Sequence, residues 1–291
     1  MNSGLSGGFL AALAALTWAT AIVLSKVSLN EADAVTIFTV QIVAATTCAV
    51  AVLMICGGRL AVTQKACLAY AAGIFEPFLA YTLSLFGLAL VPAGIVSVIF
   101  ATEAVMIVIL STLLLGLSIH GWTSFLVLLA TAFSGVIMVI LPDLNDGTGS
   151  SAIGYAAVTA GVFFAALYVV ISSKLIEEIP PVELLAGQLI FCLALSVVFL
   201  MPFASYADLD PKIILIAATA GALQYYLAFH LYLMALRHIN VNVAGTMLYL
   251  IPVFTLALAY AFLGETLTPI QLTGCGIILG AVALINHRHA A

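Results

Sequence analysis

The sequence predicts an all-α integral membrane protein of ten transmembrane helices, arranged as two inverted five-helix repeats. Composition is the first observation behind this fold class, because 65% of the 291 residues are hydrophobic and only 7% are charged. Soluble domains carry about 25% charged residues, so these few charges could not cover a water-soluble globule of this size. The other two observations are polar interruptions at the spacing of membrane spans and a similarity between the halves of the chain.

Charge and cysteine content narrow the class further. The net charge is -5 and no basic cluster is present, so nucleic acid is not an expected partner. The cysteines lie in apolar segments without paired spacing or neighbouring histidines, so we expect no disulfide framework, no metal site and no cofactor. They are Cys48, Cys56, Cys67, Cys192 and Cys275.

The first predicted helix occupies residues 1–26. It has no lysine or arginine before its apolar run, which is long enough to span a membrane, so we interpret it as a helix and not as a signal peptide. Apolar runs of this length without alternating polar residues exclude a β-barrel. Short polar segments separate the remaining predicted spans from one another. These segments are 26–33, 57–65, 87–92, 117–121, 142–151, 174–183, 205–212, 237–242 and 265–268.

Basic residues set the predicted orientation. With the N-terminus in the cytoplasm, most of them fall on the cytoplasmic side, as the positive-inside rule requires. Both termini are therefore predicted to be cytoplasmic. The predicted cytoplasmic residues are Arg59, Lys65, Lys174, Arg237 and Arg288, and the outer ones are Lys26 and Lys212.

Two similar halves meet at residues 142–154, the most loop-like stretch, which predicts repeats at 1–145 and 146–291. An odd number of spans in each half reverses the orientation of the second half. Inverted repeats are typical of secondary transporters, whose substrate site lies near the midplane between the repeats. At an offset of 148 residues the matches are Ser25-Lys26 with Ser173-Lys174, Gly73 with Gly221, Glu76 with Gln224, and Leu88 with Leu236, while Gln41 and Gln188 fall one residue off.

A family resemblance rests on residues 241–284, which read VNVAGTMLYLIPVFTLALAYAFLGETLTPIQLTGCGIILGAVAL, and on the similar stretch 91–141. Together with Trp18-Ala19 to Lys26, they make nearly the whole chain resemble the EamA family of the drug/metabolite transporter superfamily. The matching positions in the second stretch are Ala244, Pro252, Gly264-Glu265, Gln271, Gly274 and Gly280.

The resemblance implies a ten-helix carrier of small metabolites in the bacterial inner membrane, commonly an exporter of amino acids, aromatic ones included. Three departures concern this sequence. Leu115 to Leu117 replace the Gly-Glu pair in the first repeat, Ala104 stands where a proline often follows the acid, and Gln41 occupies a place where many members carry arginine. Without that arginine the substrate class stays open.

Two acids, Glu76 and Glu103, fall near the middle of predicted spans, where a charge costs roughly 2.5–3.5 kcal/mol. Intramembrane acids usually face a bundle interior or a wet cavity, so each could bind a substrate amine or exchange a proton. The alternative is a neutral carboxyl group that hydrogen-bonds a neighbouring helix, or, for Glu76, backbone groups loosened by Pro77.

Other intramembrane polar residues have two interpretations each. Gln41, Gln188 and Gln224 could line a shared cavity, although interhelical packing is the commoner role of such amides. His230 shares a helical face with Tyr226 and could shuttle a proton, or it could simply be a packed residue.

Aromatic residues could wall a pocket, or they could fill the core and anchor spans at the interfaces. Pro252 is predicted to remove one hydrogen bond inside its span, which gives either a static kink or a hinge. The aromatic candidates are Trp18, Tyr81, Phe100, Phe163, Phe164, Tyr168, Tyr225, Tyr226 and Tyr249.

Positive charge is absent from the middle of every predicted span, which disfavours phosphorylated substrates. Two carboxylates and several amides instead suit a zwitterionic or weakly cationic small molecule, such as an amino acid or a cationic drug. We therefore expect an alternating-access exporter in the lipid bilayer, as a monomer or homodimer. A flippase for a lipid-linked metabolite is a further alternative, and an enzyme is disfavoured because neither an HExxH motif nor a paired catalytic Cys/His is present.

Overall fold

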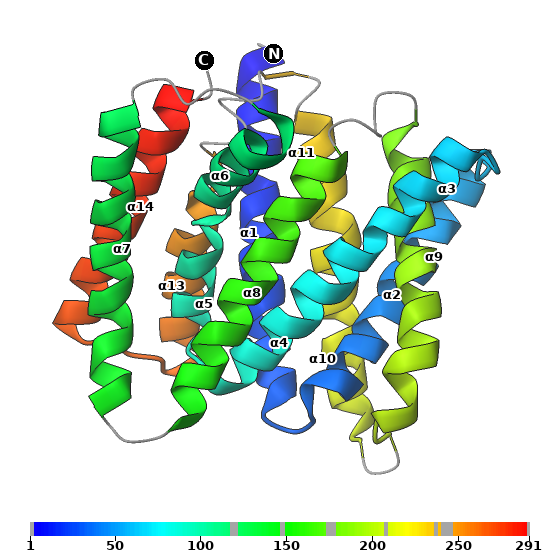
Figure 1. The fold of residues 1–291 in the computed structure, drawn as a ribbon. Helices are drawn as coiled ribbons and strands as arrows, with labels where there is room; N and C mark the ends of the chain where they lie inside the picture. The colour runs from blue at the N-terminus through cyan, green and yellow to red at the C-terminus, as the bar shows by residue number, and fades with distance from the viewer. Residues whose placement is uncertain are drawn as a thin grey trace.

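A computed structural model describes residues 3–116, 122–145, 149–172, 179–206, 209–235, 238–239 and 247–289. Every secondary-structure element in these residues is helical, and the helices form an upright bundle (Figure 1). The start of α1 and the end of α14 lie at the same end of the bundle. The predicted all-α class is confirmed for the part of the chain that is described.

The elements of the first half are α1 (Ser3–Leu29), α2 (Ala34–Ile55), α3 (Gln64–Ala71), η1 (Ala72–Ile74), η2 (Phe75–Leu79), α4 (Ala80–Leu90), α5 (Ala93–Phe100), α6 (Glu103–Leu115) and α7 (Trp122–Asn145). Those of the second half are α8 (Gly149–Ser172), α9 (Pro181–Phe199), η3 (Met201–Phe203), α10 (Pro211–Gly221), η4 (Ala222–Leu227), α11 (Ala228–Ala235), α13 (Leu250–Leu263) and α14 (Pro269–His289).

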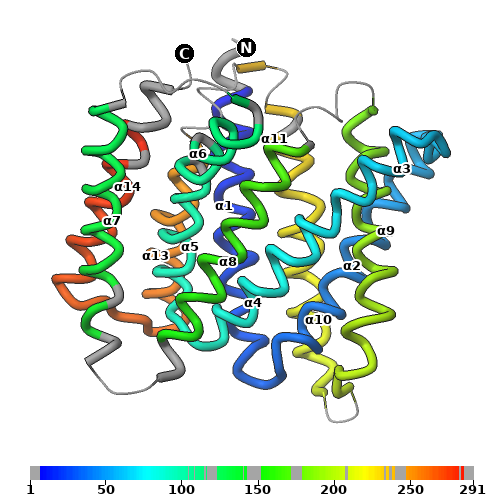
Figure 2. Tube along the Cα trace, in the orientation of Figure 1, coloured from blue at the N-terminus to red at the C-terminus, as the bar shows by residue number. Residues whose placement is uncertain are grey.

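Seven helical segments in these residues are long and apolar enough to cross a membrane, and three shorter apolar helices accompany them. Several helices continue into one another: the chain runs from α3 through η1 and η2 into α4 along one path (Figure 2), which makes Gln64–Leu90 a single candidate span. The protein is therefore a multi-pass membrane protein, as its composition predicts.

Local chemistry explains where the helices begin and end. Asp33 accepts a hydrogen bond from the Thr36 backbone N–H and caps α2, while Pro181 occupies the first position of α9, where no partner for its missing N–H is needed. Gly116 and Gly264 end α6 and α13 in the left-handed conformation, with φ of 68° and 66°. The predicted breaks at 26–33, 57–65 and 87–92 are confirmed, and 117–121 lies outside the described residues.

The predicted span across 91–116 is interrupted, which the sequence analysis did not foresee. Residues Ala101 and Thr102 form a tightened turn between α5 and α6, because the Thr102 backbone N–H bonds to the Ile99 carbonyl at 2.9 Å, three residues back. The Thr102 hydroxyl donates to the same carbonyl at 2.6 Å and competes with the regular helix ladder. Glu103 is therefore the first residue of α6 and not a mid-helix residue.

Pairs of helices from opposite halves pack against each other in reciprocal fashion. Helix α1 packs on α10, α11 and α13, and its counterpart α8 packs on α4, α5 and α6. Two glycines allow helical segments of opposite halves to approach each other closely. A Cβ on Gly73 would lie 2.8 Å from the Gln188 carbonyl oxygen, and one on Gly221 would clash with the Gln41 backbone. The two halves therefore share one core.

Candidate functional site

Glu76 lies where one membrane-crossing segment loses its regular helical geometry. It belongs to η2, a π-helical turn, and its own backbone is extended, with φ −140° and ψ 124°. Pro77 follows and supplies no N–H to the helix ladder. The Glu76 side chain is nevertheless buried, with 8% of its surface exposed. Irregular backbone of this kind is tolerated at membrane depth where it is enclosed by protein or lines a cavity.

Glu103 begins α6, directly after the turn at Ala101 and Thr102, and its side chain is half-buried. The first N–H groups of a helix have no intrahelical partner and carry the positive end of the helix dipole, so a carboxylate is favoured at this position. Glu103 and Glu76 lie within electrostatic range of each other. The two intramembrane acids that the sequence singles out are therefore brought together.

Tyr81 connects the acids to a group of aromatic rings. Its hydroxyl hydrogen-bonds to the Glu76 carboxyl group and lies within electrostatic range of Glu103. The Tyr81 ring stacks on Phe100 at 6.3 Å between centroids and meets the edge of Tyr225 at 4.8 Å. The acids are thus bounded by rings from both halves of the chain.

Trp18 joins α1 to α11 through two aromatic contacts. Its ring lies 5.1 Å from that of Phe229 and 6.0 Å from that of Tyr232, both on α11. The Tyr232 hydroxyl interacts electrostatically with Glu103. Sequence reasoning missed Tyr232, because nothing in the pattern around His230 indicates that a residue two positions later faces Trp18.

Gln41 makes hydrogen bonds at both ends of its amide. Its Nε2 donates to the Ser25 hydroxyl at 2.8 Å, and its Oε1 accepts from the Tyr225 hydroxyl at 3.0 Å. The residue is fully buried. These contacts join α1, α2 and η4, which supports the packing interpretation of this amide.

Gln188 makes an equivalent pair of contacts in the other half. Its Nε2 donates to the Ala69 carbonyl at 3.1 Å, and its Oε1 accepts from the Tyr168 hydroxyl at 3.0 Å. The contacts tie α9 to α3 and α8. Gln188 is therefore engaged with Tyr168 and with backbone, and like Gln41 it joins three helical segments, although its tyrosine partner lies on α8 and not in a π-helical turn.

Gln224 behaves differently from the other two amides. It lies in η4, is 7% exposed, and its Oε1 has no hydrogen-bond partner in the described part of the chain. The hydroxyl of Tyr226 is likewise buried without a described partner. The predicted pairing of Tyr226 with His230 is present, since their rings stack at 5.7 Å.

Tyr249 and Pro252 lie at a second interruption. The Ile251 backbone N–H bonds to the Leu248 carbonyl at 3.0 Å, three residues back, and α13 begins immediately afterwards with Tyr249 as its N-cap. Pro252 falls in the first turn of α13, where its missing N–H removes no helix hydrogen bond. The prediction that Pro252 removes one is therefore wrong, because the irregularity precedes it; its role as a hinge stays a prediction.

The four irregular segments occupy matching places in the two halves. The π-helical turns are η2 and η4, and the tightened turns precede α6 and α13. Gly264, which ends α13, follows Gly116, which ends α6, by 148 residues, the offset that also relates Glu76 to Gln224. Interrupted helices at corresponding places in two repeats are the best indicator of a transporter's binding site.

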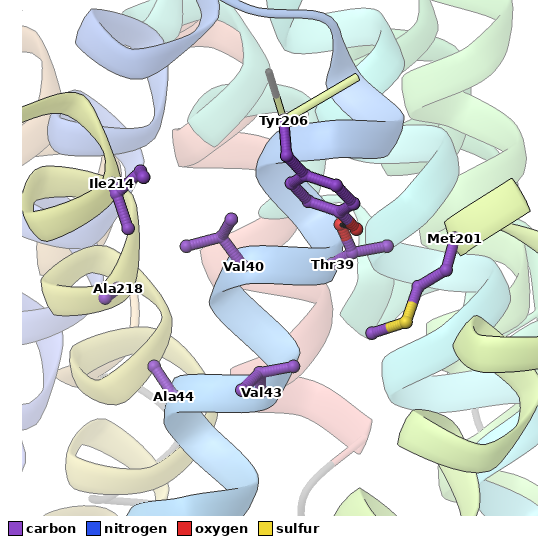
Figure 3. A pocket seen from close by; sticks show the side chains of 8 residues that line it. All are labelled: Thr39, Val40, Val43, Ala44, Met201, Tyr206, Ile214 and Ala218. Carbon is purple, nitrogen blue, oxygen red and sulfur yellow. Dashed lines mark hydrogen bonds between the residues drawn. The ribbon is translucent and has the colours of Figure 1, made fainter. Parts of the chain in front are cut away.

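A separate groove of about 400 Å³ lies on the outside of the bundle, across α2 (Figure 3). Tyr206 lies at one end, where its hydroxyl and that of Thr39 hydrogen-bond at 2.7 Å. No charged residue lines the groove, which favours an apolar occupant such as a lipid chain. Its lining residues are Thr39, Val40, Val43, Ala44, Met201, Tyr206, Ile214 and Ala218.

A polar junction lies at the turn between α4 and α5. The Lys26 ammonium group donates to the Leu88 and Val91 carbonyls at 2.6 and 3.0 Å, where α4 ends. The Glu265 carboxylate accepts from the Ala93 backbone N–H at 2.9 Å, where α5 begins, and attracts Lys26. From the sequence, Lys26 is expected in a polar segment between two spans. In the structure, Lys26 is half-buried and ties α1 to the α4–α5 turn.

Comparison with known proteins adds a family relationship. A model of the EamA-like transporter family matches residues 5–141 and again residues 152–287. A crystal structure of another protein superposes with a TM-score of 0.68 and 17% sequence identity, and the match covers 98% of this chain and 99% of that one. At that identity the likeness concerns the fold alone. No curated protein matches the chain.

Proposed function

Because the chain belongs to the EamA-like transporter family, we propose that it exports amino acids, aromatic or neutral, across the bacterial cytoplasmic membrane. The observation that carries this proposal is that Glu76 and Glu103, each at a helix interruption, lie within electrostatic range of each other and near aromatic rings from both halves. Carboxylates bind an ammonium group, and the rings accommodate an apolar side chain.

The transport mechanism is alternating access of two inverted repeats, residues 1–145 and 146–291, each with five spans and both termini in the cytoplasm. Three observations support this arrangement: the family model matches twice, helices of opposite halves pack reciprocally, and the helix interruptions recur at matching places. Rocking of one repeat against the other exposes the acids first to one side of the membrane and then to the other.

The substrate itself supplies the positive charge at the site. No lysine or arginine of the described residues is among the groups that interact with Glu76, and Lys26 is engaged at the α4–α5 turn with Glu265 nearby. A buried carboxylate without a protein counter-charge is stabilised by a bound amine or by a proton. The same acids therefore either bind the substrate amine or exchange a proton during the cycle.

One alternative is efflux of cationic or amphipathic drugs, which the same acids and rings would also bind. A flippase for a lipid-linked metabolite is less well supported. The outer groove across α2 lacks charged lining residues, so it offers no counter-charge to a charged head group. Of these two places in the described part of the chain, the interior acids have the chemistry for a charged cargo.

Counterflow into proteoliposomes tests the proposal. Vesicles preloaded with unlabelled amino acids are diluted into a trace of labelled amino acid, with protein-free vesicles as the control. Saturable accumulation of neutral or aromatic amino acids is the expected result. If no amino acid accumulates while a lipophilic cation exchanges readily, the amino-acid proposal is overturned in favour of drug efflux.

A further inference from the structure

The outer groove has a floor from the first half of the chain and walls from the second half. Its floor is one face of α2, and one wall is α10 (Figure 3). The other wall is formed by Met201 in η3 and by Tyr206, which follows η3. Helix α2 packs against both α9 and α10, so the groove is a hollow between two neighbours of one helix.

The groove covers only half of the span that forms its floor. Its floor residues run from Thr39 to Ala44, whereas α2 is a candidate span of 22 residues, Ala34–Ile55. At a rise of 1.5 Å per residue, Ala44 lies about 15 Å from the start of α2, and the hydrocarbon core of a bilayer is about 30 Å thick. The groove therefore extends from near one membrane surface to the midplane, which is the depth of one leaflet.

Polar groups lie at the membrane-surface end of the groove. There the hydroxyls of Tyr206 and Thr39 hydrogen-bond at 2.7 Å, and the Ser205 backbone N–H donates to the Thr36 hydroxyl at 2.9 Å. Tyrosine is common at this depth in membrane proteins, because its ring is apolar and its hydroxyl is polar. The other lining residues are valine, alanine, isoleucine and methionine. The groove is thus polar at the surface end and apolar towards the midplane, as a lipid is.

The surface around the groove is apolar and exposed. Leu215 follows Ile214 in α10 and is 67% exposed, and Phe203 lies in η3 and is 78% exposed. In a membrane protein, side chains of this kind face lipid, so the groove is continuous with the lipid-facing surface. An apolar hollow of about 400 Å³ does not hold water, and an empty one forfeits van der Waals contacts. A lipid chain is therefore the material available to fill it.

We propose that the outer groove binds one acyl chain of a phospholipid from the leaflet at the start of α2. The chain lies along α2, between α10 and Met201, and its ester end lies near Tyr206 and Thr39. Because the floor and the walls come from different halves, the bound chain packs on both halves at once. The inference concerns the membrane lipid and does not depend on which substrate is transported.

Photolabelling in vesicles tests the inference. Wild type is reconstituted into phosphatidylcholine vesicles with a trace of phosphatidylcholine that carries a diazirine midway along one acyl chain, and labelled residues are mapped by mass spectrometry. The controls are Phe133 on α7 and Leu272 on α14, which are also exposed apolar residues. Lipid chains are as apolar as the groove, so only packing favours the site, and we expect Val43 and Met201 to be labelled roughly threefold more than the controls.

A substitution that fills the groove provides a second readout. Ala44→Phe places a ring on the groove floor, so we expect labelling of Val43 and Met201 to fall to the level of the controls. If that variant does not fold, Ala218→Phe fills the groove from the α10 wall. Ala130→Phe is the matched control, because Ala130 is an exposed alanine on α7, and its labelling pattern should equal that of wild type.

Two results would overturn the inference. Equal labelling of the groove and the control residues in wild type would show that the groove does not hold a chain. Labelling of the groove below that of the controls would show that a protein surface, such as a second copy of the chain, covers it. Neither result bears on the proposed function, which the counterflow measurement tests separately.

Discussion

Glu76 in η2 and Gln224 in η4 lie at matching places in the two halves, yet only the first is an acid with a second acid beside it. Each sits in a π-helical turn within a membrane-crossing segment, although of the two turns only η2 has a residue with non-helical backbone angles, Glu76 itself. The two halves therefore share a way of interrupting a helix and differ in the group presented there. The acid of the first half therefore has a neutral residue as its counterpart in the second half.

The residues that pack the two halves together, in contrast, are the same in both halves. Gly73 approaches the Gln188 backbone just as Gly221 approaches that of Gln41, and both glutamines are bonded at each end. Both contacts are needed to hold the halves together, whereas only one acid pair is needed to bind an amine. Duplicated residues thus mark the scaffold, and unmatched polar residues mark the candidate site.

The largest effect is expected at the acids. Glu76→Gln and Glu103→Gln keep the shape of each side chain but remove the charge that binds an amine. Loss of a charge-assisted contact corresponds to roughly 10- to 100-fold, so we expect counterflow of amino acids to fall by about that factor in at least one variant. Rates are measured per folded protein in proteoliposomes.

Glu31→Gln is the matched control for these variants, because Glu31 is an exposed acid between α1 and α2. We expect its transport rate to equal that of wild type. Wild-type rates in both interior variants, at acid and neutral pH alike, would rule out a role for the acids in binding and in proton exchange.

Substitutions of the two glycines at the contacts between the halves should lower the stability of the fold. Gly221→Ala places a methyl group against the Gln41 backbone, and overpacking of this kind costs about 1–3 kcal/mol, so the melting temperature in detergent should fall. Gly73→Ala should behave similarly. Gly276→Ala is the control: nothing lies within 4 Å of its new Cβ, and an alanine in a helix should leave stability equal or slightly higher.

A smaller loss of stability is expected for Gln41→Leu, which leaves the Ser25 and Tyr225 hydroxyls without their partner. One such contact is worth about 0.6 kcal/mol on average in membranes, and the unpaired groups add to that cost. Transport per folded protein should stay within about twofold of wild type, a change worth less than half a kcal/mol. Greatly reduced transport at unchanged stability would instead place Gln41 at the substrate.

The smallest effect on stability is expected for Asp33, which caps α2; the corresponding helix of the second half has no such cap. Burial alone would raise the Asp33 pKa, but hydrogen bonds from Thr36 and from the Val35 backbone outweigh it and hold the pKa below its usual value. A carboxyl group with a lowered pKa stabilises the fold at neutral pH, and this contribution is lost as the pH falls through the folded-state pKa. The counterpart of α2, α9, has Pro180 at its N-cap position and no side-chain cap.

Asp33→Asn isolates that contribution, because asparagine also caps helices but does not titrate. Melting temperatures of wild type and variant are compared from neutral pH to about pH 3, below the usual aspartate pKa. We expect a small advantage of wild type at neutral pH that disappears in acid. A constant difference across the range would show that ionisation of Asp33 does not contribute.

Much of this architecture could be predicted from the sequence. Composition alone indicates membrane-spanning helices, and the predicted breaks at 26–33 and 87–92 coincide with the ends of α1 and α4. The offset that pairs Glu76 with Gln224 also pairs the two π-helical turns. Hydrophobic runs and short polar loops are local features of the sequence, so they can be recognised without knowing the tertiary contacts.

The interruption before α6 could not be predicted, because the turn at Ala101 and Thr102 contains neither glycine nor proline, whereas Pro77 did indicate loosened backbone at Glu76. Nor could the partners of the polar side chains be predicted: Gln41 and Gln224 look alike in sequence, and only their neighbours show that one is bonded and the other is not. Tyr232 was missed for the same reason, since its contact with Trp18 joins residues far apart in the chain.

Equilibrium binding most directly tests the claim that the acids of the first half hold the substrate amine, because transport can fail for reasons unrelated to binding. Labelled amino acid is titrated onto detergent-purified wild type, Glu76→Gln, Glu103→Gln and Glu31→Gln. We expect Kd to rise roughly tenfold or more in at least one interior variant and to stay unchanged in the control. Saturable binding with the same Kd in all four proteins would contradict the claim and place the substrate elsewhere.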